Sequence, residues 1–128
     1  MEKLTNCEIV INIELIELII GGNERFEILF TTKSDEKYRF IFDFVWDMRY
    51  SIENASLNRF YHFRECLNEG FKNNGVYVVE DSEYIRYFEN QVSGTRPVSD
   101  LVHYIICDEI DTVIDVLANK APILVKLS

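Results

Sequence analysis

The sequence feature that most constrains the fold is a run of alternating residues between Tyr38 and Arg49. Every second position is a large apolar residue, and most positions between them are charged. The apolar set is Tyr38, Phe40, Phe42, Phe44, Trp46 and Met48, and the charged set is Arg39, Asp43, Asp47 and Arg49. Alternation of this kind is typical of a β-strand with one buried face. An apolar face this wide, built mainly of aromatics, must cover a helix or close a curved sheet.

Further strands and one or two helices are predicted around this run. Residues 8–20 are predicted to be one long strand with a bulge near Leu15, because the polar positions change parity there. Isoleucines at helical spacing leave a helix as an alternative for this segment. Shorter strands are predicted at residues 26–30, 76–79, 101–107, 112–118 and 123–127. One helix is predicted from residue 51 to 70, unless the first residues prolong the strand, and a second from Asp81 or Ser82 to Gly94.

Together these elements predict an α+β fold: a mostly antiparallel, curved sheet of about six strands with one or two helices packed on it. The chain has 128 residues, so we expect a single globular domain over residues 1–128. Aromatic residues make up 13% of the chain, which argues against a disordered protein.

Charge and targeting signals predict the environment of the protein. Thirteen basic residues against 22 acidic ones give a formal charge of -9, which would repel a nucleic acid. The apolar run over residues 9–20 is interrupted by Glu14 and Glu17, unlike a secretory signal, and no other run is long enough to cross a membrane. Three widely spaced cysteines form no disulfide framework. We therefore expect a cytoplasmic protein with neither a membrane nor a nucleic-acid partner.

Motifs for metal, cofactor or nucleophilic chemistry are not found in the sequence. His62 and His103 have no further ligands at a recognised spacing, so no metal site is predicted. The pair Gly21-Gly22 is followed by Glu24, whose carboxylate would oppose a phosphate, so no nucleotide cofactor is expected. There is no Gly-x-Ser-x-Gly motif and no cysteine beside a plausible base. No catalytic residue or cofactor is therefore predicted, and an enzyme is not the favoured class.

One charged strand face remains a candidate site. Asp43 and Asp47 share a face with Arg49, but four residues of extended strand separate two carboxylates by roughly 13 Å, too far for a direct pair. Ion pairs with Arg39 and Arg49 along a solvated face are the simpler interpretation. Trp46 is expected in the core, or as an interface anchor if it is exposed. Whether Asp43, Asp47, Arg49, Arg59 and His62 converge is left open.

The acidic residues are unevenly distributed. No Lys or Arg lies between Pro97 and Asn119. The acidic residues of this segment are Asp100, Asp108, Glu109, Asp111 and Asp115, and Glu80, Asp81 and Glu83 precede it. Isolated carboxylates usually belong to a solvated surface, but a group of them raises the rate of encounter with a basic protein. The five carboxylates of the segment are therefore the candidate partner-binding residues.

Three hypotheses for function follow. The first is a non-enzymatic, acidic protein-binding module that docks a basic partner; a bacterial immunity protein or antitoxin that neutralises a basic toxin has these properties. The second is a small-ligand-binding or enzymatic domain with an aromatic-lined pocket. Its expected lining is Phe42, Phe44, Trp46, Tyr77 and Tyr104. The third is a structural subunit that forms a homodimer through the exposed edge of the long first strand.

Overall fold

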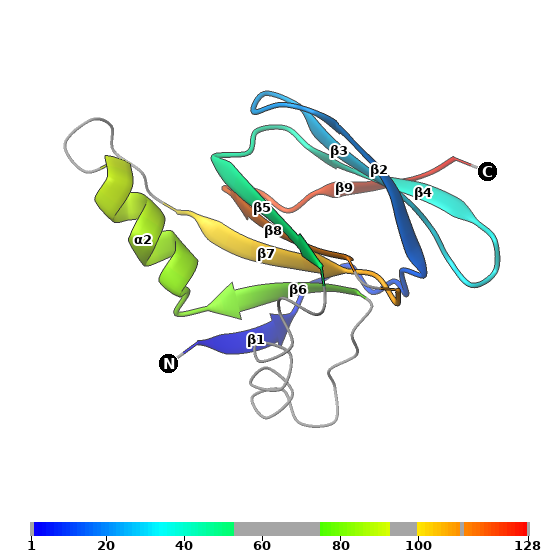
Figure 1. The fold of residues 1–128 in the computed structure, drawn as a ribbon, viewed down its shortest axis with the longest axis horizontal. Helices are drawn as coiled ribbons and strands as arrows, with labels where there is room; N and C mark the ends of the chain where they lie inside the picture. The colour runs from blue at the N-terminus through cyan, green and yellow to red at the C-terminus, as the bar shows by residue number, and fades with distance from the viewer. Residues whose placement is uncertain (1, 53–74, 93–99, 111, 128) are drawn as a thin grey trace.

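The computed structural model describes residues 2–52, 75–92, 100–110 and 112–127, which form two antiparallel sheets and one helix (Figure 1). The five-stranded sheet has the order β1 (Lys3–Asn6), β6 (Gly75–Glu80), β7 (Val102–Cys107), β8 (Thr112–Ala118) and β5 (Asp47–Ile52). The four-stranded sheet has the order β2 (Leu15–Gly21), β3 (Phe26–Thr31), β4 (Lys37–Phe42) and β9 (Ile123–Lys126). The helix is α2 (Glu83–Val92).

The expected α+β class and the antiparallel pairing are confirmed, but the strands form two sheets where one sheet of about six strands was predicted. The alternating run over residues 38–49 is divided between the sheets: β4 ends at Phe42, and β5 begins at Asp47 in the other sheet. The four residues between them cross over, and their backbone is held at Val45 by Asn23 O (2.7 Å) and at Trp46 by Leu117 O (2.8 Å). Alternation in sequence therefore continues across a change of sheet.

The first predicted strand is shorter than expected, and its bulge is confirmed. Strand β2 begins at Leu15, and its register against β3 shifts between Ile16 and Leu18. The predicted helix over residues 51–70 begins inside β5, which extends to Ile52, and its remainder lies outside the described residues.

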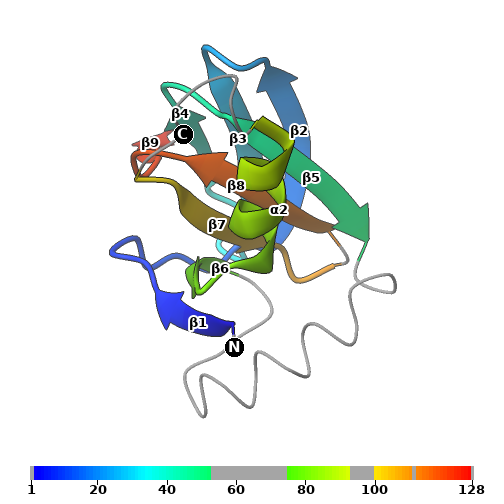
Figure 2. The same ribbon diagram turned by 90° about the vertical axis from the view of Figure 1, so that its left-hand side faces the viewer.

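Helix α2 begins where the sequence predicted. The Ser82 hydroxyl accepts a hydrogen bond from the backbone N–H of Ile85 at 3.1 Å, as an N-cap residue does. Figure 2 shows α2 lying over the outer face of the five-stranded sheet, in front of β7 and β8. Its Tyr84 ring meets the His103 ring of β7 edge-on at 5.3 Å, and its Phe88 ring meets Trp46 at 6.4 Å. The described helix is not long and apolar enough to cross a membrane.

The core between the two sheets combines aliphatic side chains with a group of aromatic ones. Phe30 stacks on Phe40 at 4.8 Å, and Phe42 meets the Tyr104 ring of the other sheet edge-on at 5.8 Å. All four side chains are buried. Aromatic contacts of this kind contribute about 0.5–1.5 kcal/mol each beyond the area that they bury. The β4 part of the predicted aromatic face therefore packs in the core between the sheets, whereas Phe44 and Trp46 do not belong to that core.

The turn between β2 and β3 contains a glycine whose backbone conformation can be tested by substitution. Gly21 has a φ of 101°, and a Cβ atom there would lie 2.0 Å from the carbonyl oxygen of Arg25, whereas a Cβ at Gly22 would meet nothing within 4 Å. We expect Gly21→Ala to lower the free energy of unfolding by about 2 kcal/mol, the usual range of such strain. Gly22→Ala is the matched control, and urea unfolding measures both. Equal effects of the two substitutions would contradict this account of the turn.

Candidate functional site

A chain of buried polar side chains lies between α2 and the five-stranded sheet. The Ser82 hydroxyl is 2.7 Å from Nδ1 of His103, and Nε2 of His103 is 2.6 Å from the Asp115 carboxylate. Strand β7 supplies the histidine and β8 the aspartate, from diagonally neighbouring positions of the ladder. A carboxylate only accepts hydrogen bonds, so Nε2 carries a proton and donates it to Asp115. The Ser82 oxygen is shared by Nδ1 of His103 and the N–H of Ile85, so each of these groups has a hydrogen-bond partner.

A second branch begins at Tyr84, next to this chain. Its phenol donates a hydrogen bond to the Asp47 carboxylate of β5 at 2.7 Å, and the Arg49 guanidinium lies 3.7 Å above its ring. Burial raises the pKa of Tyr84 above its ordinary value, and the hydrogen bond to Asp47 raises it further. The structure thus brings Asp47 and Arg49 together through one aromatic side chain.

The serine, histidine and aspartate have the residue types of a nucleophilic catalyst but not its arrangement. In serine hydrolases the aspartate holds Nδ1 and the nucleophile faces Nε2. Here the arrangement is reversed: Nδ1 contacts Ser82, and Nε2 contacts Asp115. The Ser82 residue is only 4% exposed, and its oxygen is occupied by the N–H of Ile85. What this arrangement does is fix the start of α2 on the sheet.

An open hollow of about 340 Å³ adjoins this array at the start of α2. We call it the acidic hollow; its lining residues are Glu2, Arg49, Glu83, Tyr84 and Tyr87. One carboxylate oxygen of Glu2 accepts the backbone N–H of Glu83 at 3.0 Å, which holds Glu2 beside the helix. Tyr87 is 64% exposed. Carboxylates beside an exposed aromatic ring suit a cationic side chain.

The buried phenol of Tyr84 predicts a late alkaline titration. A folded pKa raised above the unfolded value of about 10 contributes stability that is complete below that pH and is lost as the pH rises above it. Phenolate absorbance should therefore divide into an early phase before unfolding and a late phase during unfolding, with Tyr84 in the late phase. Tyr84→Phe should remove one late-titrating phenol and leave the early phase unchanged. A smaller early phase in that variant would contradict the prediction.

The predicted charged strand face is only partly assembled. Asp47 and Arg49 meet at Tyr84, but Asp43 is exposed on the crossover, beside a separate hollow of about 140 Å³. Arg39 pairs with Glu27 of β3 at 2.6 Å, so the expected ion pairs along one strand do not include it. Trp46 is half-buried, and its indole N–H donates to Asn119 at 2.6 Å. Of the residues whose convergence was left open, Arg59 and His62 lie outside the described part.

The five predicted partner-binding carboxylates occupy different environments. Asp108 and Asp115 are buried and hydrogen-bonded, so they belong to the interior and not to an accessible face. Glu109 is exposed and pairs with Lys33 at 3.1 Å, and Asp100 is exposed before β7. Asp111 lies outside the described residues. Of the described carboxylates of that segment, Asp100 and Glu109 are the ones accessible to a partner at the surface.

The predicted aromatic pocket lining is also divided. Phe42 and Tyr104 are buried in the core between the sheets, and Tyr77 belongs to a separate buried cluster with Leu4 and Ile105. Phe44 contacts Trp46 near the surface at 5.2 Å. The five aromatic residues therefore do not line one cavity.

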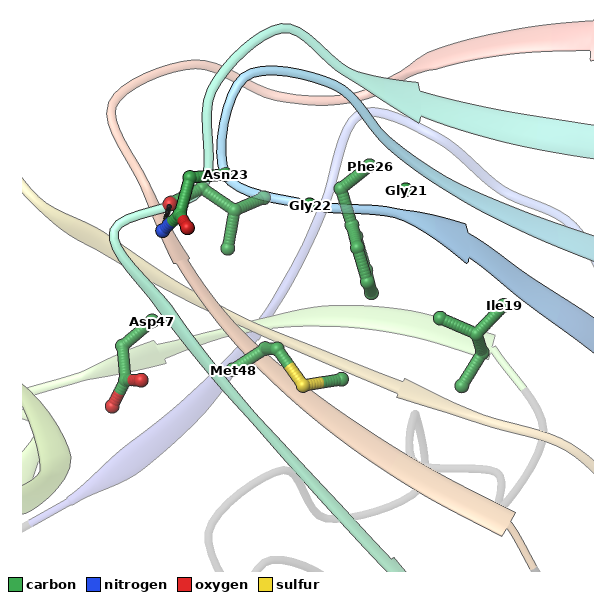
Figure 3. A pocket seen from close by; sticks show the side chains of 8 residues that line it. Ile19, Gly21, Gly22, Asn23, Phe26, Asp47 and Met48 are labelled. Atoms are coloured by element: carbon green, nitrogen blue, oxygen red, sulfur yellow. Dashed lines mark hydrogen bonds between the residues drawn. The ribbon is translucent and has the colours of Figure 1, made fainter.

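A different hollow, of about 400 Å³, lies where the ends of β2 and β5 face each other (Figure 3). Figure 3 shows the side chains of Ile19, Phe26 and Met48 directed into this space, and Asp47 turned away from them. Its lining is mainly apolar, and it is open to solvent.

The contacts of His103 with Ser82 and Asp115 were not predicted, although the sequence contains a signal for the contact with Asp115. His103 and Asp115 are single polar residues inside apolar strands. Buried polar groups must find hydrogen-bond partners, so isolated polar residues in two such strands indicate mutual contact.

Within the described ranges, no three His, Cys, Asp or Glu side chains are grouped as metal ligands would be. No known protein family, curated protein or solved structure matches the chain.

Proposed function

We propose that this chain is a cytoplasmic, non-enzymatic protein-binding module that docks a basic partner at the acidic hollow. The observation that carries the proposal is the composition of that hollow, where Glu2 and Glu83 stand beside the exposed ring of Tyr87. Glu80 is also exposed just before the helix, whereas the carboxylate of Asp81 is already paired with Arg86 at 2.6 Å. A Lys or Arg side chain can place its charge between the carboxylates and its stem against the ring.

The overall charge favours the same kind of partner. A formal charge of -9 raises the rate at which a basic protein encounters the chain, and contacts at the hollow then fix its orientation. Arg49 lies against the Tyr84 ring, so that ring already has a cation, whereas Tyr87 presents its ring at the surface. Within this class we favour an immunity protein or antitoxin that neutralises a basic toxin, because its task needs a small acidic surface and no catalysis.

A titration with a synthetic arginine-glycine peptide tests the docking site. Amide shifts in nuclear magnetic resonance should change first at Glu2, Glu83 and Tyr87, and Glu2→Gln/Glu83→Gln should weaken binding at least tenfold. The matched control is Glu17→Gln/Glu24→Gln, which removes the same charge from exposed positions of β2 and of the turn between β2 and β3. Equal weakening in both variants, or shifts spread over all acidic residues, would overturn the site.

The immunity or antitoxin assignment has its own test. Each gene adjacent to the chain in its native genome is expressed alone and together with the chain, and growth is measured. A neighbouring basic protein that stops growth alone, and not with the wild-type chain, supports the assignment. If the Glu2→Gln/Glu83→Gln variant does not restore growth, protection by the wild-type chain depends on the acidic hollow.

The apolar hollow in Figure 3 supports a second candidate function, the binding of a small apolar ligand. Its volume and its lining by Ile19, Phe26 and Met48 suit an aliphatic chain. A titration with 1-octanol should shift the methyl signals of Ile19 and Met48 before those of Ile123, an exposed apolar residue elsewhere. Simultaneous shifts at all three residues would indicate unspecific association and contradict this candidate.

A further inference from the structure

The outer face of the four-stranded sheet is an apolar surface that the described helix does not cover. Figure 1 shows α2 on the far side of the molecule from this sheet. Eleven large apolar side chains of the described part are exposed, and five of them belong to this face. They are Leu15, Leu18, Ile20, Ile123 and Leu127. Several exposed apolar side chains on one face of a sheet mark a candidate interaction surface.

The strand register arranges this surface in rows across the sheet. One row runs through Ile20, Glu27, Ile41 and Ile123, and the next runs through Leu18, Leu29, Arg39 and Val125. Glu27 and Arg39 are the charged members of these rows, and they pair with each other at 2.6 Å. The side-chain Nε of Arg39 is buried without a hydrogen-bond partner. One charged pair therefore lies within the apolar face and retains an unused donor.

The charge of this sheet differs from that of the rest of the chain. Residues 15–42 and 123–127 contain five basic residues and five acidic residues, so their formal charge is zero. The whole excess of -9 therefore belongs to the remaining residues. A basic partner is attracted to the acidic remainder, whereas another acidic chain is repelled least at this neutral sheet.

We propose that the outer face of the four-stranded sheet binds a second copy of this chain. Packing of the two sheets face to face about a twofold axis buries the apolar rows of both copies. The acidic hollows, which belong to the other sheet, stay outside the interface.

The size of the face sets the expected strength of the dimer. Four strands about 4.8 Å apart, with about six residues of roughly 3.3 Å each, cover a projected area of roughly 400 Å². Both copies together contribute roughly 800 Å², which is below the roughly 1,200 Å² of standard specific interfaces and in the range of weak, transient contacts. We therefore expect a reversible dimer with a dissociation constant in the micromolar range.

Sedimentation velocity over a concentration series of the full chain tests the proposal. The wild type should change from monomer to dimer, and Ile123→Lys/Leu127→Lys should weaken association at least 100-fold. These residues are 57% and 41% exposed, so lysine is tolerated in the monomer. The matched control is Tyr50→Lys/Ile52→Lys on β5, with exposures of 57% and 45% and the same change of charge. The control should dimerise like the wild type.

Three results would overturn the proposal: a wild type that stays monomeric at the highest concentration, a dimer that survives the β9 substitutions, or equal loss in both variants. A dimer that survives would point to the free edge of β2, which the β9 substitutions leave unchanged. Salt separates this proposal from the docking of a basic partner. Added salt screens the repulsion between two acidic copies and strengthens the dimer, whereas it weakens the binding of the arginine-glycine peptide.

Discussion

Replacement of Asp108 by alanine is expected to lower the free energy of unfolding by about 4 kcal/mol. One oxygen of this buried carboxylate accepts the backbone N–H groups of Ile110 (3.1 Å) and Thr112 (2.9 Å). The other accepts the N–H of Ile16 in β2 at 2.9 Å, so this side chain connects the two sheets. Alanine leaves donors without an acceptor, and each such loss costs about 1–3 kcal/mol.

Urea unfolding measures this effect against two companion variants. Glu109→Ala changes the exposed neighbour and should cost less than about 1 kcal/mol, as exposed ion pairs do. Asp108→Asn keeps only one accepting oxygen and should fall between the alanine variant and the wild type. A cost for Asp108→Ala no larger than that of Glu109→Ala would show that the connection between the sheets does not depend on this carboxylate.

Replacement of Asp115 by alanine is expected to cost a similar amount, about 4 kcal/mol. The side chains of Asp115 and His103 are each exposed by 1% or less, and they contact each other at 2.6 Å. Removal of the carboxylate leaves the Nε2–H group of His103 buried without an acceptor, which costs about 1–3 kcal/mol or more because the lost acceptor is charged, and the cavity adds to this cost. The same change also releases the chain that holds Ser82 at the start of α2.

A double-mutant cycle separates this coupling from simple loss of packing. His103→Leu/Asp115→Ala removes both polar groups, so its cost should be clearly smaller than the sum of the two single costs. Unfolding in urea gives all three values, and circular dichroism reports whether α2 persists. Additive costs would mean that His103 and Asp115 act independently, contrary to the observed geometry.

Local features of the fold could be predicted from the sequence because they depend on near neighbours. The cap of α2 at Ser82 and the bulge in β2 are set by residue types within a few positions. The change of sheet between Phe42 and Asp47 could not be predicted, because the alternation continues through it. What determines that crossover is distant: Asn23 and Leu117 hold the backbone of Val45 and Trp46.

The candidate sites show the same division between near and distant partners. The acidic segment after Pro97 was interpreted as one surface, yet Asp108 and Asp115 are buried because their partners come from other elements. Whether a carboxylate is exposed cannot be read from the residues next to it in the sequence. The sequence identifies Glu83 only as one of the acidic residues that precede this segment. Its position beside Glu2 results from the pairing of β1 with β6, more than 70 residues apart.

The pairing of β4 with β9 has a consequence for how the protein is made. Tyr38 lies opposite Lys126, so the third strand of the four-stranded sheet receives its last neighbour from a segment about 85 residues later. Pairings over such distances must overcome a large loss of chain entropy, and they are formed late and slowly in folding. A nascent chain therefore exposes an open edge at β4 until β9 leaves the ribosome. During synthesis, this edge is where we expect chaperones to act.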